Sequence, residues 1–82
     1  MHVILDARKL GNRDTAHAYL KKVFSFPDYY GNNLDALHDC LTELPFSSNL
    51  TVHFLHAEDA GEYFPAVRSV FEELSGVEFF NI

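Results

Sequence analysis

Residues 26 to 44 read Phe-Pro-Asp-Tyr-Tyr-Gly-Asn-Asn-Leu-Asp-Ala-Leu-His-Asp-Cys-Leu-Thr-Glu-Leu, an aromatic turn followed by a helical pattern. An α-helix turns by about 100° per residue, which places the leucines of this stretch on one stripe, with Cys40 at its edge. These leucines are Leu34, Leu37, Leu41 and Leu44. Asp35, Asp39 and Glu43, together with Thr42, fall on the opposite side. The stretch therefore predicts a helix with one face packed on a core and one acidic face exposed.

The acidic face carries like charges one turn apart, because Asp35, Asp39 and Glu43 follow an i, i+4, i+8 spacing. Each such pair costs roughly 0.2–0.5 kcal/mol in an isolated helix. No lysine or arginine occurs between Lys22 and Arg68 to relieve this repulsion. We therefore expect the counter-charges on another molecule, although a solvated helix face with the tyrosines packed at its base would explain the same charge pattern.

The rest of the chain alternates between strand and helix patterns. Strands are expected over residues 2–7, 50–56 and 77–82. A first helix should run to about residue 24, a loop should follow over 25–31, and the last helical region should cover 58–75. Asn12 or Asp14 is expected to cap the first helix, because a short polar side chain can accept from the unpaired N–H groups there. In the same way Asn32 or Asn33 is expected to cap the acidic helix, which should end before Pro45.

Apolar spacing in these elements predicts the core. The expected core residues of the first and last helices are Ala16, Tyr19, Leu20, Val23, Val67, Val70, Phe71 and Leu74. One face of the 50–56 strand is expected to carry Leu50, Val52, Phe54 and His56. Gly61 and Pro65 should divide the last helix into two pieces, and Gly76 should end it. Strands joined by helices imply parallel pairing, so we predict an α/β fold of two layers, a three-stranded parallel sheet with helices packed on it.

Length and composition limit the possible classes of protein. Eighty-two residues without repeats or a linker predict a single domain over 1–82. The net charge of −6 argues against binding nucleic acid or an anionic membrane surface, and suits a basic partner. One cysteine cannot form an internal disulfide, no signal-peptide pattern opens the chain, and its apolar runs are shorter than the ~20 residues of a membrane span. We therefore expect a cytoplasmic protein.

A metal site and a cysteine nucleophile are the two chemical alternatives that the sequence suggests. Asp35, His38 and Asp39 could ligate a metal from one helix, but a site needs a further ligand, and His53 and His56 lie on opposite faces of their strand. Cys40 has Asp39 beside it, and carboxylates raise the pKa of a thiol, which disfavours a nucleophile. Ser-His-Asp order and a Gly-rich phosphate loop are both absent from the sequence. We expect no metal, no cofactor, no catalytic residues and a core cysteine.

The run Pro27, Tyr29–Gly31, Asn33–Leu37 and Asp39–Thr42 resembles the barstar family, intracellular protein inhibitors of the secreted ribonuclease barnase. The resemblance implies the barstar fold. It also implies that Tyr29, Asp35, Asp39 and Thr42 face a nuclease, with Asp39 in its phosphate pocket. Glu73 matches an additional interface glutamate of the family, with Glu72 as the alternative register. The residues predicted to bind the partner are Tyr29, Tyr30, Gly31, Asn33, Asp35, His38, Asp39, Thr42, Glu43 and Glu73.

The implied partner explains these residue types. A ribonuclease active site is lined with cations that hold a phosphodiester and leaves room for a base to stack. An inhibitor of such a site needs carboxylates in the place of phosphates and flat rings in the place of bases. Asp35 and Asp39 supply the carboxylates, and Tyr29 and Tyr30 supply the rings.

The sequence departs from the family at three positions near this surface. His38 replaces a tryptophan, Glu43 replaces a glycine, and Leu44 replaces a second tryptophan. These changes predict a cognate nuclease that is a relative of barnase rather than barnase itself.

Taken with the charge pattern, the resemblance predicts a bacterial, cytoplasmic inhibitor, monomeric when free, that binds a basic barnase-like ribonuclease one-to-one without a cofactor. One alternative is a binding module of the same fold for an unrelated basic protein. The other is an enzyme that uses Asp35, Asp39 and Glu73 as acid and base. The enzyme requires these carboxylates to converge in a concave pocket, whereas the sequence is expected to place them on a convex helix face.

Overall fold

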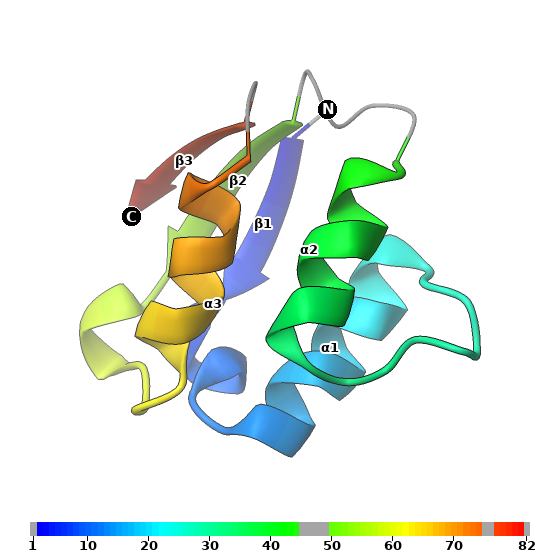
Figure 1. The fold of residues 1–82 in the computed structure, drawn as a ribbon. Helices are drawn as coiled ribbons and strands as arrows, with labels where there is room; N and C mark the ends of the chain where they lie inside the picture. The colour runs from blue at the N-terminus through cyan, green and yellow to red at the C-terminus, as the bar shows by residue number, and fades with distance from the viewer. Residues whose placement is uncertain (1, 45–49, 75–76, 82) are drawn as a thin grey trace.

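The elements of the chain, taken from a computed structural model, follow the predicted order (Figure 1). The structure describes residues 2–44, 50–74 and 77–81. Its elements are β1 (His2–Asp6), η1 (Ala7–Leu10), α1 (Arg13–Phe24), α2 (Leu34–Thr42), β2 (Leu50–Leu55), η3 (Ala57–Asp59), α3 (Phe64–Glu72) and β3 (Val77–Asn81). The division of the last helical region is confirmed, since a short 3-10 helix, η3, precedes α3. The expected roles of Pro45 and Gly76 lie outside the described residues.

The strands form one sheet in the order β1-β2-β3, and each neighbouring pair is parallel. Val3 lies opposite Val52 in the first pair, and Val52 opposite Phe79 in the second. The predicted α/β class and parallel pairing are therefore confirmed. Within the described residues, no helix combines the length and apolar character needed to cross a membrane.

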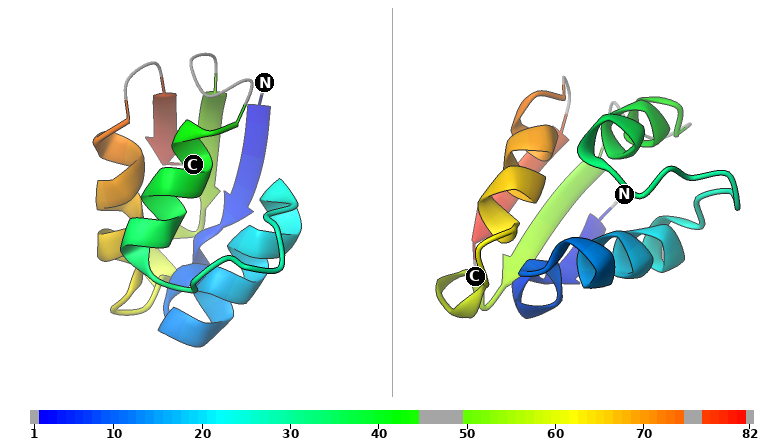
Figure 2. Two further views of the ribbon diagram at one scale, coloured as in Figure 1. Left: turned by 45° about the vertical axis from the view of Figure 1, so that its right-hand side comes forward. Right: turned by 60° about the horizontal axis from the view of Figure 1, so that its bottom comes forward.

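The helices cover one face of the sheet (Figures 1 and 2). Val3 and Leu5 of β1 are buried under them, while Ile4, which points to the other face, is 61% exposed. β2 alternates in the same way between buried and half-buried residues. His56 was expected to share one face of the strand with Leu50, Val52 and Phe54, and this is wrong. It lies beyond the end of β2 with a φ of 58°, so the strand's alternation no longer sets its direction.

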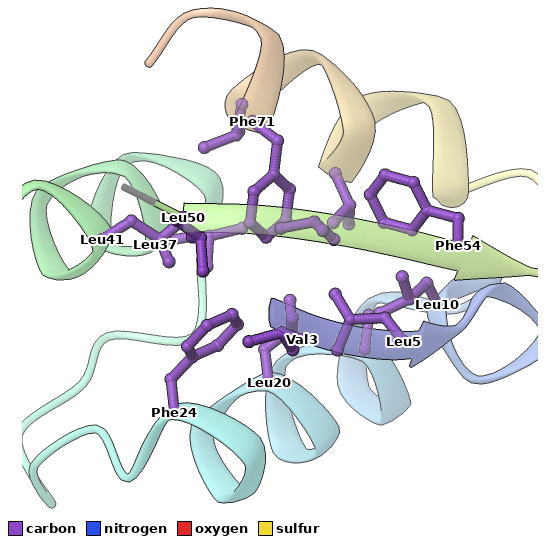
Figure 3. Packing of buried hydrophobic residues seen from close by; sticks show 14 of the residues in the cluster. Val3, Leu5, Leu10, Leu20, Phe24, Leu37, Leu41, Leu50, Phe54 and Phe71 are labelled. Atoms are coloured by element: carbon purple, nitrogen blue, oxygen red, sulfur yellow. The ribbon is translucent and has the colours of Figure 1, made fainter. Parts of the chain in front are cut away.

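Phe71 of α3 lies near the middle of the core, where it points towards β2 (Figure 3). Its ring packs edge-on against Phe54 at 5.8 Å between centroids and lies 6.3 Å from Phe24 of α1. Val23 was wrongly expected in this core, because the buried stripe of α1 runs through Leu20 and Phe24 instead and leaves Val23 exposed.

Side-chain caps fix where α1 and α2 begin. The Asn12 side chain accepts from Thr15 N–H at 3.2 Å, which selects it over Asp14 as the cap of α1. Asn33 accepts from Ala36 N–H at 2.7 Å and caps α2. Asn32 has a φ of 52°, a left-handed conformation that asparagine tolerates better than most residues. The aromatic turn therefore enters α2 at a defined angle.

Candidate functional site

A groove of about 680 Å³ runs between α2 and α3. This acidic groove is lined by Leu34, Asp35, His38, Asp39, Ala66, Ser69, Val70 and Glu73. In Figure 2 (left), α2 crosses in front of the sheet between α3 and α1, so that its outer side remains accessible. The expectation of a convex acidic face is wrong, because α3 packs beside α2 and supplies the second wall.

Three carboxylates from two helices line the acidic groove. Asp35 and Asp39 come from α2, and Glu73 follows the end of α3. His38 is the other titratable residue of the groove, and its Nδ1 lies 4.0 Å from Asp39 Oδ1, a pairing that is ionic only when the imidazole is protonated. The Asp39 side chain is nevertheless 81% exposed. The groove thus presents negative charge to anything that approaches it from solvent.

The two neighbouring glutamates of α3 have different surroundings. Glu72 forms an ion pair in which its Oε1 lies 3.2 Å from Arg68 Nε, with an i, i+4 spacing along the helix. Glu73 lines the acidic groove. Of the two glutamates, Glu73 therefore shares the groove with the carboxylates of α2, and its contact with a partner stays a prediction.

A second, smaller hollow of about 230 Å³ adjoins the acidic groove. This tyrosine hollow is lined by Tyr29, Tyr30, Gly31, Ala36, Asp39, Cys40 and Glu43. Tyr29 is 80% exposed, although most aromatic rings among the residues whose burial is described are buried. Asp39 lines both hollows, so its carboxylate stands between the acidic helical walls and the exposed ring.

Tyr30 was predicted as a second exposed ring, and this is wrong. The residue is 5% exposed, its ring lies 4.9 Å from that of Phe26, and its hydroxyl is bonded to His17 Nδ1 at 2.5 Å. Burial raises the pKa of this hydroxyl, with smaller contributions from Cys40 and Tyr63. Tyr30 thus anchors the aromatic turn to the core. Of the two adjacent tyrosines, Tyr29 is the one with an exposed ring.

Asn33 and Thr42 line neither hollow and use their side chains within the protein. Asn33 caps α2 and also donates to Gly31 O at 3.3 Å. Thr42 donates its hydroxyl hydrogen to Asp39 O at 2.8 Å. Asn33 and Thr42 nevertheless remain exposed to solvent. Their hydrogen bonds shape the surface on either side of Asp39.

Other reactive groups do not converge on the groove. Cys40 is half-buried against the core, and burial, then Glu43 and Asp39, raise the pKa of its thiol, as predicted. Among the residues that the structure describes, the group whose ligand atoms lie within 4.8 Å of one another is His56, Glu58 and Asp59, beyond the end of β2. Exposed acidic groups of this kind are common without an ion, and these residues line neither hollow.

Sequence reasoning missed two kinds of residue near the site. Ala66 and Ser69 form the α3 wall with Glu73, and only their spacing of three and four residues along one helix side could have signalled it. His17 and Tyr63 were not singled out at all. His17 was hidden because a lone histidine in a polar helix gives no sign of burial, yet it is 1% exposed.

Fold and site together define a small α/β protein that offers a partner an acidic groove with an exposed aromatic ring beside it. A family model described as "Barstar (barnase inhibitor)" matches residues 1–78, so the chain belongs to the barstar family. It is also similar to a protein of Bacillus subtilis (strain 168) named "Putative ribonuclease inhibitor YrdF". The two are 40% identical, over 87% of this chain and 81% of that protein. Members of this family are inhibitors rather than enzymes.

Proposed function

We propose that this protein inhibits a basic, barnase-like ribonuclease by inserting the carboxylates of the acidic groove into the nuclease active site. The complex is one-to-one and non-covalent, forms in the bacterial cytoplasm from a monomeric inhibitor, and needs no cofactor. The observation that carries the proposal is the position of Asp39, which lines both the acidic groove and the tyrosine hollow. An inhibitor that fills a ribonuclease active site needs a carboxylate in the place of the phosphate and, beside it, a flat ring in the place of the base.

The open form of the groove favours binding over catalysis. Asp35, Asp39 and Glu73 do converge in a hollow. However, the Asp39 side chain is largely in solvent, whereas many active sites strengthen the action of their catalytic groups by excluding water. Because these carboxylates lie in a hollow, the shape of the site does not exclude an enzyme. The exposure of Asp39 and the family to which the chain belongs both support an inhibitor.

Two departures from the family pattern line the proposed interface. His38 lies in the acidic groove, and Glu43 lies in the tyrosine hollow. Glu43 adds a carboxylate where the family has a residue without a side chain, so the partner surface opposite it should differ from that of barnase. This is why we propose a relative of barnase as the target.

Inhibition should be stoichiometric and its association rate should depend strongly on salt, because a protein of net charge −6 is steered towards a basic active site. At about 0.15 M salt the Debye length is about 8 Å, so part of the steering should survive under cellular conditions. Titration of the protein against small basic ribonucleases, including one secreted by the producing organism, measures both properties. Binding of a basic protein without loss of ribonuclease activity would favour the alternative, a binding module for an unrelated partner.

The α3 wall gives a separate prediction. Glu73→Ala should weaken inhibition by about tenfold, since it removes one of three groove carboxylates, a contribution of about 1–2 kcal/mol for a charge at a partly open interface. Glu72→Ala is the matched control, because it removes the same charge from the adjacent residue, which pairs with Arg68. Inhibition constants for the two variants test the assignment, and a larger loss for Glu72→Ala would reverse it.

A further inference from the structure

We propose that Phe26 is a positioning residue of the binding site: its buried ring anchors the aromatic turn, residues 25–31, and so holds the exposed ring of Tyr29 in place before a partner arrives. The effect on nuclease inhibition rests on the function proposed above. The anchoring itself is a property of the free protein and can be measured without a nuclease.

Tyr29 depends on the turn for its position. Its side chain is 80% exposed, and it forms no hydrogen bond with, and packs on no aromatic ring of, another described residue. The ring nevertheless borders the tyrosine hollow together with Asp39. In Figure 1 the turn is the loop that leaves the end of α1 and returns to the start of α2. Since Tyr29 has few contacts of its own, the backbone of this loop must set the direction of its ring.

Two backbone hydrogen bonds define the path of the turn. Phe26 N–H donates to Lys21 O at 3.0 Å, which ties the start of the turn to the last residues of α1. Tyr30 N–H donates to Pro27 O at 3.0 Å, which closes a β-turn with Tyr29 at its corner. Between these bonds Pro27 has a φ restricted by its ring to about −65°. The corner that carries Tyr29 therefore has little freedom while both bonds hold.

The side chain of Phe26 supports these bonds from the core. Its ring is 7% exposed and stacks on the ring of Phe24, with 5.6 Å between centroids and 17° between planes. It also lies 4.9 Å from the ring of Tyr30. Phe24, the last residue of α1, points into the core, where it lies 6.3 Å from Phe71 of α3 (Figure 3). A row of buried rings thus connects both sides of the turn to the core.

Anchoring of this kind should matter for binding, because a loop that is already ordered does not have to be ordered by the partner. Loss of loop and side-chain freedom on association subtracts from affinity, and a preorganised loop avoids that loss. Without the Phe26 ring the turn would lose one of its buried supports, and Tyr29 would sample positions away from the tyrosine hollow. Phe26 therefore acts through Tyr29 and need not touch the partner.

Phe24 supplies the matched control. It has the same side chain, the same exposed fraction of 7% and a place in the same row of rings, but it lies in α1 rather than in the turn. Phe24→Ala and Phe26→Ala remove equal apolar volume, so a difference between them reports on the turn rather than on general stability. If Phe26→Ala does not fold, Phe26→Leu carries the tests, with Phe24→Leu as its control.

The first test uses the free protein. The Tyr30 amide closes the β-turn, and its hydrogen exchange should be at least about tenfold faster in Phe26→Ala than in the wild type, because local opening becomes easier. Phe24→Ala should instead act mainly on the amides of residues 20–24. Protection of the Tyr30 amide that is unchanged in Phe26→Ala, or that falls equally in Phe24→Ala, would overturn the proposal.

The second test asks whether Phe26 acts through Tyr29. Phe26→Ala should weaken nuclease inhibition by about fivefold in the wild type, but by less than about twofold in Tyr29→Ala, where no ring is left to position. Phe24→Ala should have the same small effect in both backgrounds. Equal losses from Phe26→Ala with and without the Tyr29 ring would mean that Phe26 only supports the fold, which contradicts the proposal. If the exchange results hold but the wild type inhibits no nuclease, the proposed function fails and the anchor stands.

Discussion

Asp39→Ala should weaken inhibition of the nuclease by about 30-fold to several thousand-fold. Removal of one side of a desolvated charge pair costs about 2–5 kcal/mol or more in binding, because the partner's cations are left buried and unpaired. Asp39 is the residue for which this loss should be largest, since it lines both hollows of the site. The barnase–barstar complex is itself the standard example of such a hot spot, so this magnitude is taken from the family.

The same substitution should leave the fold intact. The Asp39 side chain is largely exposed, and its loss relieves the like charges of Asp35 and Glu43 one turn away. Asp35→Ala and Tyr29→Ala should cost less in inhibition than Asp39→Ala, and Glu43→Ala should cost least. Asp28→Ala is the matched control, because Asp28 is an exposed carboxylate of the turn that pairs with Lys21 at 3.6 Å.

Inhibition constants and melting temperatures for these variants test the ranking. Undiminished inhibition by Asp39→Ala would contradict the site. So would a loss of inhibition that merely follows a fall in melting temperature.

Phe71→Ala should have the largest effect on stability, about 3–5 kcal/mol of the free energy of unfolding. Phe71 is fully buried and contacts the rings of Phe54 in β2 and Phe24 in α1, so its removal leaves a cavity where α1, α3 and the sheet meet. A domain of this size has only about 5–15 kcal/mol of stability at most. The variant should therefore be partly or largely unfolded near 37 °C.

Urea denaturation measures this effect, with Phe71→Leu as the control that keeps most of the apolar volume. Phe71→Leu should lose less than half as much stability as Phe71→Ala. Equal stability of Phe71→Ala and wild type would mean that α3 does not pack on the sheet through this residue.

The parts of this protein that could be predicted from sequence are those fixed by neighbours along the chain. The leucine stripe of α2 and the Asn33 cap follow from helical geometry within one or two turns, and Leu37 and Leu41 are buried as this geometry requires. The alternation of Val52 and Phe54 likewise predicts which face of β2 is covered.

What could not be predicted depends on packing between distant segments. The acidic groove exists because α3 lies beside α2. The spacing of Asp35 and Asp39 along their own helix does not predict which helix packs next to it. Tyr29 and Tyr30 are adjacent in a loop without periodicity, so the sequence does not tell which ring is exposed. The burial of Tyr30 depends in turn on His17 from another helix.

The central claim is that the acidic groove occupies the phosphate-binding site of a ribonuclease, and a competition titration tests it most directly. The association of this protein with a small basic ribonuclease would be measured at increasing concentrations of a nucleotide monophosphate that fills the nuclease active site. The account predicts that the apparent Kd rises in proportion to nucleotide concentration, and that Asp39→Ala loses much of this dependence. A Kd that does not change with nucleotide, with a complex that holds both ligands at once, would contradict it.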